Sequence, residues 1–208
     1  MKQNKIIELS PYHSPIGPLL LGSYEQLLCL CLWEESASFE KRLQKIQALS
    51  GASFVHKSSP IIEETKRQLD EYFNKKRSNF HLPIHFWGTS FQQATWNELI
   101  KIPYGTTISY KALAQKVGNE QAVRAVANAN NKNFISIIVP CHRVIGSKGE
   151  LVGYAGGLNK KAFLLQLEQQ NQHNKSASLF KEDDFFKEDM RLQQGAMQSK
   201  NKLNVNGM

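Results

Sequence analysis

The feature that most constrains the fold of this chain is the segment Pro140-Cys141-His142-Arg143-Val144, which follows an apolar run at residues 135–139. A short apolar run of this kind is consistent with a buried strand. Proline fixes its own φ and cannot donate to a strand ladder, so we expect the strand to end at Pro140 and a turn to follow. The sequence therefore predicts a cysteine thiol presented at the exit of a buried strand.

The residues around Cys141 decide whether its thiol is reactive. A free thiol has a pKa of about 8.5, so a nucleophilic cysteine needs a base. His142 is adjacent, but neighbouring side chains of an extended segment point in opposite directions, so a water molecule or a turn would have to connect the two. The base needs an orienting acceptor, and Glu168 is an acid on an apolar helix face. We predict Cys141, His142 and Glu168 as the catalytic set; the alternatives are an inert thiol and a core histidine.

A second pattern indicates nucleic-acid binding. Two short helices, predicted at residues 110–117 and 120–128, are joined by a tight turn, as in a helix-turn-helix. The polar side of the second helix carries three residues in line: Gln121, Arg124 and Asn128. Residues 88–170 hold nine Lys and Arg against four Asp and Glu, a net charge of +5 that suits a polyanion. The same geometry also occurs in plain helical bundles, and basic surfaces are common, so both alternatives stay open.

The rest of the chain predicts an α+β protein. Residues 1–85 show a hairpin with strands at 19–21 and 27–33, a helix through Phe39, a further strand at 54–55 and a second helix that opens at Pro60. After a linker at 83–88, a helix is expected to open on the capping-box pair Ser90 and Gln93. A last helix, at 159–170, would bury Phe163, Leu164 and Leu167. Low hydrophobicity predicts a disordered tail at 171–208, with a short docking helix around Phe185 as the alternative.

Composition narrows the class of protein further. Three cysteines are too few and too odd in number for a disulfide scaffold, and Cys29 and Cys31 lie in the predicted strand without a second pair at metal-ligand spacing. No apolar run is long enough to span a bilayer, and the N-terminus has no secretory signal pattern. We expect a protein of the cell interior, with no membrane partner, no metal and no cofactor.

Five blocks of the sequence, in order, resemble one family. The segment Pro140–Val144 resembles the active-site motif of the O6-alkylguanine-DNA alkyltransferases, the methylated-DNA–protein-cysteine methyltransferases, of bacterial type. The other blocks resemble the family's helix-turn-helix entry, recognition helix, hinge and substrate loop: Ile102-Pro103-Tyr104-Gly105 with Ser109-Tyr110, residues 122–126, Asn133 with 137–140, and residues 153–157. The resemblance implies a ribonuclease H-like α/β domain at 1–85, followed by a helical, winged helix-turn-helix-like alkyltransferase domain at 86–170.

The resemblance also implies an activity. The alkyl group of O6-alkylguanine in duplex DNA would move irreversibly to Cys141, once per molecule, after the nucleotide has flipped out of the stack. O4-alkylthymine stays open as a second substrate. Arg124 would intercalate from the minor groove, Tyr110 would help rotate the nucleotide and protonate the leaving base, and Asn133 would hold the turn of Cys141. We expect a monomer, cytoplasmic in a bacterium and nuclear in a eukaryote.

The expected pocket departs from the family pattern at two positions. Its wall would be formed by five residues: Ser136, Val144, Tyr154, Ala155 and Gly156. Some family members carry proline at the position of Ser136 and serine at that of Ala155, so this chain is expected to tolerate alkyl groups larger than methyl. Arg143 would be structural and would bridge the two domains.

Three other functions compete with alkyl transfer. A non-repairing relative would bind alkylated DNA but would lack the reactive cysteine, which is present here. A cysteine hydrolase would turn over repeatedly and would not explain Tyr110 or Arg124. A DNA-binding regulator with an incidental cysteine would survive the loss of Cys141, and the regulators that carry this domain need more cysteines for a zinc site.

Overall fold

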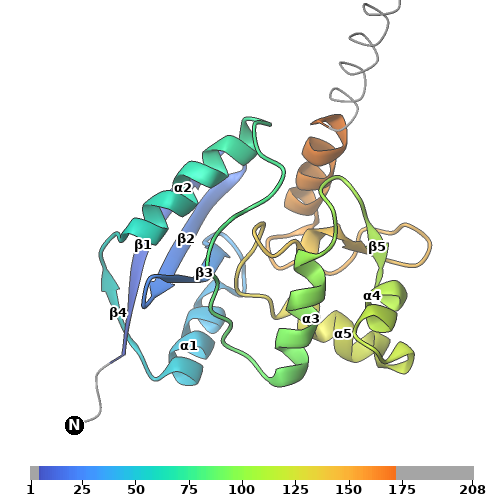
Figure 1. Cartoon of the computed structure of the whole chain (residues 1–208), viewed down its shortest axis with the longest axis horizontal. Coiled ribbons are helices and arrows are strands. Elements are labelled where there is room, and N and C mark those ends of the chain that lie inside the picture. The colour runs from blue at the N-terminus through green and yellow to red at the C-terminus, as the bar shows by residue number, and fades with distance from the viewer. Residues whose placement is uncertain (1–4, 172–208) are drawn as a thin grey trace, which may run out of the picture. The chain divides into compact units, whose positions relative to one another are not determined.

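The computed structural model describes residues 5–171, so the expected tail, apart from its first residue, lies outside the described residues. The first half forms a four-stranded sheet of order β3-β2-β1-β4 (Figure 1). Its strands are β1 (Ile6–Ser14), β2 (Gly17–Tyr24), β3 (Leu27–Trp33) and β4 (Ser53–His56). Neighbours β1, β2 and β3 are antiparallel, whereas β4 pairs parallel with β1. The predicted hairpin is confirmed; β1 was missed because its sequence, which includes Pro11 and Glu8, has no apolar run.

Two helices accompany this sheet. α1 (Phe39–Ser50) precedes β4, and α2 (Pro60–Phe73) lies along the sheet against β1, β2 and β3 (Figure 1). Pro60 stands at the start of α2, where its fixed φ suits a helix and its missing N–H costs nothing. Both helices were predicted from apolar periodicity, and both are confirmed.

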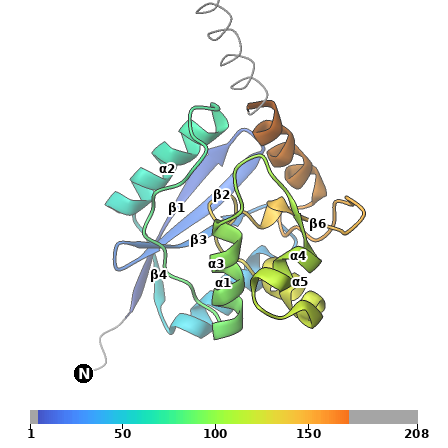
Figure 2. The same ribbon diagram turned by 45° about the vertical axis from the view of Figure 1, so that its right-hand side comes forward.

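The second half is mostly helical (Figure 2). It contains α3 (Ser90–Ile100), β5 (Ile108–Ser109), α4 (Tyr110–Lys116), the 3₁₀ turn η1 (Glu120–Ala122), α5 (Val123–Asn131), the 3₁₀ turn η2 (Cys141–Arg143) and β6 (Val144–Ile145). Helices α3, α4 and α5 pack on one another, and residues 158–171 form a final helix. The two-helix unit α4–α5 predicted from the sequence is present, although its second helix starts with the 3₁₀ turn.

Two local predictions were wrong in detail. The capping box of α3 is formed by Thr89 and Gln92, one residue earlier than predicted, because the Thr89 hydroxyl accepts the Gln92 amide while the Gln92 side chain accepts the Thr89 amide. In the final helix Leu164 and Leu167 are buried, but Phe163 is 38% exposed. Ser109 does cap α4, since its hydroxyl accepts the amide of Ala112 at 3.1 Å.

The predicted strand at residues 135–139 is absent. Ile135 makes one isolated bridge with Cys31 of β3, and the chain then turns. The Val139 amide donates back to the Ile135 carbonyl at 3.0 Å, and Ile137 takes a positive φ of 70°. All five residues are buried, and the run is apolar apart from Ser136 because it is buried, not because it extends. Cys141 therefore leaves a compact turn, and not a sheet.

The free edge of β3 bonds both to the linker and to the second half. On one stretch the Leu28 amide donates to Pro83 and the Leu28 carbonyl accepts from His85, both at 2.9 Å. On another stretch the Cys31 amide donates to Phe134 and its carbonyl accepts from Ser136, again at 2.9 Å. The segment that leads into the cysteine turn is thus bonded to the sheet. Within residues 5–171, no helix has the length and apolarity needed to span a bilayer.

Candidate active site

Asn133 organises the turn that carries Cys141. Its side-chain nitrogen donates to the Val139 carbonyl at 2.9 Å and to the Cys141 sulfur at 3.2 Å, while its oxygen accepts the Ile135 amide at 2.9 Å. One buried amide therefore satisfies the turn's backbone and contacts the thiol. An asparagine that bonds to nearby backbone offers an alternative to a strand ladder, which explains why residues 135–139 do not extend.

His142 and Glu168 form a buried pair. His142 Nε2 lies 2.9 Å from Glu168 Oε1, and both side chains have no exposed surface. Burial lowers the pKa of His142, against the opposing charge of Glu168, so the imidazole is neutral at physiological pH. The carboxylate can only accept, so Nε2 carries the proton and Nδ1 carries a lone pair. Nδ1 is buried without a hydrogen-bond partner among the described residues, which leaves it available as a base.

Five donors hold the Glu168 carboxylate. Oε1 accepts from His142, Arg143 and Tyr72, and Oε2 accepts from Arg143 and the Gly105 amide, all at 2.8–3.0 Å. Burial alone would raise the pKa of Glu168, but the hydrogen bonds from His142 and Arg143 and the positive charge of Arg143 hold it well below its usual range. Glu168 is therefore an ionised anchor.

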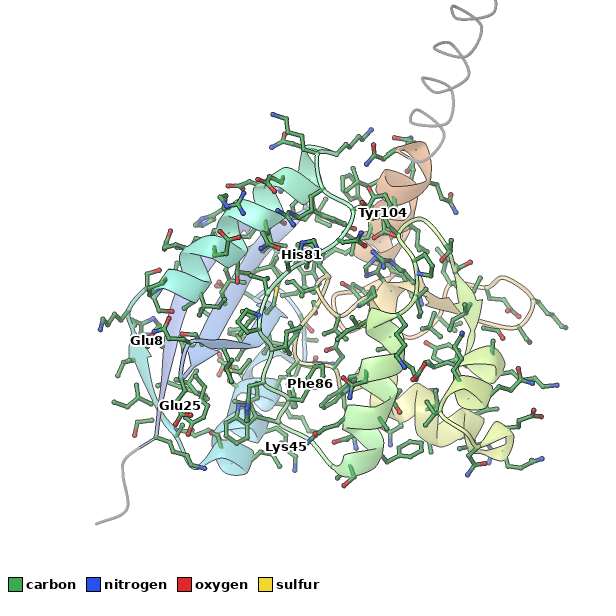
Figure 3. All side chains as sticks on the ribbon, viewed as in Figure 1. Glu8, Glu25, Lys45, His81, Phe86 and Tyr104 are labelled. Carbon is green, nitrogen blue, oxygen red and sulfur yellow. The ribbon has the colours of Figure 1, made fainter. Side chains whose placement is uncertain are left out.

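Arg143 does not make the expected link between domains. Its guanidinium bonds to Glu168 and to the Ile102 carbonyl and lies 5.7 Å from the ring centroid of Tyr104, all residues of the second half. Figure 3 shows Tyr104 beside the final helix. The link is made by Tyr72 of α2, whose hydroxyl donates to Glu168 at 2.8 Å. The positive charge of Arg143 compensates the buried carboxylate of Glu168 within the same domain, and a buried carboxylate cannot lose such a partner without a large cost in stability.

Two cations from other elements act on Cys141. Burial raises the pKa of its thiol, while the hydrogen bond from Asn133 and the charges of Arg42 and Lys161 act to lower it. Arg42 of α1 donates to the Asn133 carbonyl at 2.7 Å and also to the Asn131 carbonyl. Lys161 is fully buried and donates to the Val144 and Val152 carbonyls, both at 2.6 Å, and burial lowers the pKa of Lys161 to about 8.

The residues expected to line the pocket lie on two segments. Ser136 and Val144 are buried on either side of the cysteine turn, and Tyr154 is buried in the loop that also carries Ala155 and Gly156. The rings of Tyr154 and His142 meet edge to face, with centroids 6.4 Å apart. The start of the same loop contacts α4, since the Tyr110 hydroxyl donates to the Val152 carbonyl at 3.3 Å. Only 4% of Cys141 is exposed.

The predicted DNA-binding residues lie on the outer side of η1 and α5. Gln121, Arg124 and Asn128 are all exposed. The opposite side of α5 packs into the protein through Val126, Ala129 and Asn130, and the Asn130 side chain donates to the Cys141 carbonyl at 3.4 Å. The outward face of this helix and the thiol are therefore separated by a single helix and its following turn.

Sequence reasoning missed four residues that support the site: Trp33, Arg42, Tyr72 and Lys161. Three of them come from the first half, where no chemical motif stands out. A lysine inside an apolar helix face was a usable signal for Lys161. In the part of the chain that the structure describes, no cluster of three or more His, Cys, Asp or Glu residues could hold a metal ion.

Two family models match nearly the whole described region. The 6-O-methylguanine DNA methyltransferase ribonuclease-like domain matches residues 9–86, and the DNA-binding domain of the same name matches residues 90–170. The fold agrees with these matches, since a sheet domain is followed by a helical domain in the same order along the chain. The chain belongs to the 6-O-methylguanine DNA methyltransferase family, as its resemblance predicted.

Individual relatives agree with this assignment. A methylated-DNA–protein-cysteine methyltransferase of Methanosarcina barkeri is 44% identical over 164 residues, which cover 76% of this chain and 94% of the relative. The constitutive protein of that name from Bacillus subtilis is 42% identical over 159 residues, covering 75% and 92%. Among solved structures, Mycobacterium tuberculosis OGT in complex with DNA has a TM-score of 0.67 and 37% identity, covering 80% of this chain and 94% of that one.

Proposed function

We propose that this chain repairs alkylated duplex DNA by transferring the alkyl group of O6-alkylguanine to the sulfur of Cys141. The observation that carries the proposal is the buried arrangement of Cys141 with Asn133, and of His142 with Glu168, directly after an exposed DNA-binding helix. The names of the relatives and the DNA complex of the Mycobacterium relative support it. A thioether does not hydrolyse, so each molecule would act once.

The geometry supports a displacement reaction. The Cys141 thiol gives its proton through water to Nδ1 of His142, whose imidazolium is then stabilised by Glu168. The sulfur attacks the alkyl carbon, an S–C bond forms, and the C–O6 bond breaks with its electron pair passing to guanine. The guanine base would take a proton from the Tyr110 hydroxyl as it leaves, and the tyrosinate would be reprotonated from water.

DNA would approach on the side of α5. Gln121, Arg124 and Asn128 present one polar stripe to the duplex, with Arg124 filling the space from which the damaged base departs. Since Cys141 is only 4% exposed, the alkyl carbon cannot reach it while the base is stacked, so the nucleotide has to rotate out. The gap closed by Tyr110 and the loop at 152–153 is the route by which it would enter.

Substrate range and working state are also part of the proposal. Ser136 is buried beside the thiol, and Ala155 offers a methyl group where a hydroxyl would narrow the pocket. The wall would thus accept alkyl groups larger than methyl. We infer that the protein works as a monomer, because the site draws all its residues from one chain. It would work in whichever compartment holds the DNA.

Mass spectrometry of the reacted protein tests this proposal. The protein is incubated with a duplex containing O6-methylguanine and digested, and we expect one methyl group on the peptide that carries Cys141. The peptide with Cys29 and Cys31 is the internal control: burial raises the pKa of both thiols, no cation among the described residues opposes it as Arg42 and Lys161 do at Cys141, and both should stay unmodified. Cys141→Ala should abolish transfer while retaining DNA binding. Tight binding by the natural chain with an unmodified Cys141 would instead identify a non-repairing DNA-binding protein.

A further inference from the structure

Trp33, at the end of β3, reaches the substrate loop of the other domain. Its indole Nε1 donates to the hydroxyl oxygen of Tyr154 at 3.0 Å, across 121 positions of sequence. Trp33 is 2% exposed and Tyr154 is 8% exposed. A buried indole N–H needs a partner, and a buried hydroxyl loses stability without one, so this bond orients both rings.

The same indole sets how closely the loop backbone can approach. A Cβ atom added to Gly156 would lie 2.3 Å from Cδ1 and 2.6 Å from Nε1 of Trp33. Side chains do not tolerate such distances, so the loop can rest on the indole only because residue 156 is glycine. The position of Gly156, one wall of the expected pocket, is therefore determined by a residue of the first domain.

Two polar contacts flank the indole. The Ser36 hydroxyl donates to the Ala155 carbonyl at 2.7 Å. Lys160 Nζ lies 2.9 Å from a Glu35 carboxylate oxygen and 5.3 Å from the centroid of the Trp33 ring. Each of the loop residues 154–156 thus has a contact with the stretch at 33–36.

The loop passes this constraint to the reacting centre through Tyr154. The Tyr154 ring meets the His142 ring edge to face. One side chain therefore separates Trp33 from His142, the neighbour of Cys141 in the chain.

We propose that Trp33 is a positioning residue that sets the width of the alkyl-binding pocket from the N-terminal domain. This inference rests on the proposed function. With the indole in place, Tyr154 and Gly156 are held in position, and this wall of the pocket is fixed. When the N–H and the bulk of the indole are removed, the loop relaxes outward. A methyl group is then held less well, while a larger alkyl group gains room.

Single-turnover rates measure this effect. Trp33→Phe keeps an aromatic ring but removes the N–H, and the rates are compared on duplexes containing O6-methylguanine or O6-benzylguanine. We expect methyl transfer to slow by about tenfold, the size of one lost buried hydrogen bond, and the benzyl-to-methyl ratio to rise. Duplex affinity should not change, because Gln121, Arg124 and Asn128 keep their exposed positions. The matched control is Trp87→Phe, since Trp87 packs on Tyr24 and His85.

A double-mutant cycle separates positioning from general destabilisation. In a Tyr154→Phe background, Trp33→Phe should cause no further change in the benzyl-to-methyl ratio, because its partner is already gone. If Trp33→Phe does not fold, Ser36→Ala is the second variant: Ser36 is half-buried, and its hydroxyl makes one bond to the loop, at Ala155, besides its local bonds to Ser38. Its ratio should rise in the same direction.

The outcomes are distinguishable. Natural protein that never modifies Cys141 overturns the proposed function. Natural protein that transfers methyl, together with a folded Trp33→Phe variant whose ratio equals that of Trp87→Phe, overturns the role of Trp33 alone. Additive effects of Trp33→Phe and Tyr154→Phe on the ratio would overturn it as well.

Discussion

Tyr72→Phe tests whether the N-terminal domain stabilises the catalytic carboxylate. The change removes a hydroxyl that donates to Glu168 at 2.8 Å in a fully buried setting. Glu168 keeps four donors, so no group is left without a partner, and the loss is that of one hydrogen bond to a charged acceptor. Such a bond contributes about 1.5–3 kcal/mol, and with a urea slope of about 2 kcal/mol/M the unfolding midpoint should fall by about 1 M.

The pH dependence of this loss has a defined sign. The pKa of Glu168 is depressed in the folded protein, so its contribution to stability is complete above the unfolded pKa of about 4.3 and disappears as the pH falls through the folded value. Removing a donor to the charged form raises the folded pKa. The acid limb of the stability profile of Tyr72→Phe should therefore move to higher pH, and methyl transfer should slow because His142 is held less firmly.

Tyr12→Phe is the matched control. The Tyr12 hydroxyl also donates to a carboxylate at 2.8 Å, but that carboxylate belongs to the exposed Asp70. We expect a loss of about 1 kcal/mol or less and an unchanged transfer rate. Urea unfolding followed by circular dichroism at pH 7 and at lower pH values gives both numbers. If Tyr72→Phe and Tyr12→Phe have equal midpoints and equal transfer rates, the reasoning about Glu168 is refuted.

Two further predictions concern cations. Lys161→Met removes a charge that lowers the pKa of Cys141, so we expect the pH profile of methyl transfer to shift to higher pH. It also removes a donor to the Val144 carbonyl, so the free energy of unfolding should fall by about 1–3 kcal/mol. An unshifted pH profile would contradict the electrostatic role of Lys161. Arg124→Ala should weaken duplex binding and reduce the slope of log affinity against log salt concentration by about 1, while the free energy of unfolding changes by less than about 0.5 kcal/mol. The control is Lys45→Ala, an exposed lysine of α1 (Figure 3), which should leave binding unaltered in the same salt titration.

Local signals predicted most of the secondary structure. Pro60, Ser109 and the turn between β2 and β3 act within a few residues of themselves, so their effects can be predicted from sequence alone. The error of one residue at the start of α3 arose because Thr89 and Ser90 are equally suited to cap a helix, and only the packed helix selects one.

The apolar run at 135–139 shows where local signals fail. Burial makes such a run apolar whether it extends or turns, so periodicity cannot choose between a strand and a turn. The choice is made by the side chain of Asn133, which lies outside the run and bonds to both of its ends. The resemblance assigned Asn133 to the turn, but the conformation of the turn was still predicted wrongly.

Within the site, the pairing of His142 with Glu168 was predictable because an acid on an apolar helix face needs a buried partner. The contributions of the first domain were not predictable. Tyr72 lies 96 positions from Glu168, and Arg42 lies 91 positions from Asn133, and nothing in the sequence near either residue signals the distant partner.

The bonds along the edge of β3 have a consequence for how this protein can be divided. Two separately described domains meet near residue 88, which suggests two portable modules. However, an isolated N-terminal fragment would expose the amide and carbonyl of Cys31 on an apolar strand, because their partners Phe134 and Ser136 lie in the other half, and such an edge is a template for aggregation. The catalytic half in turn would lose the strand that its cysteine turn leans on. We therefore expect each half to need the other in order to stay folded, so that the two behave as one unit.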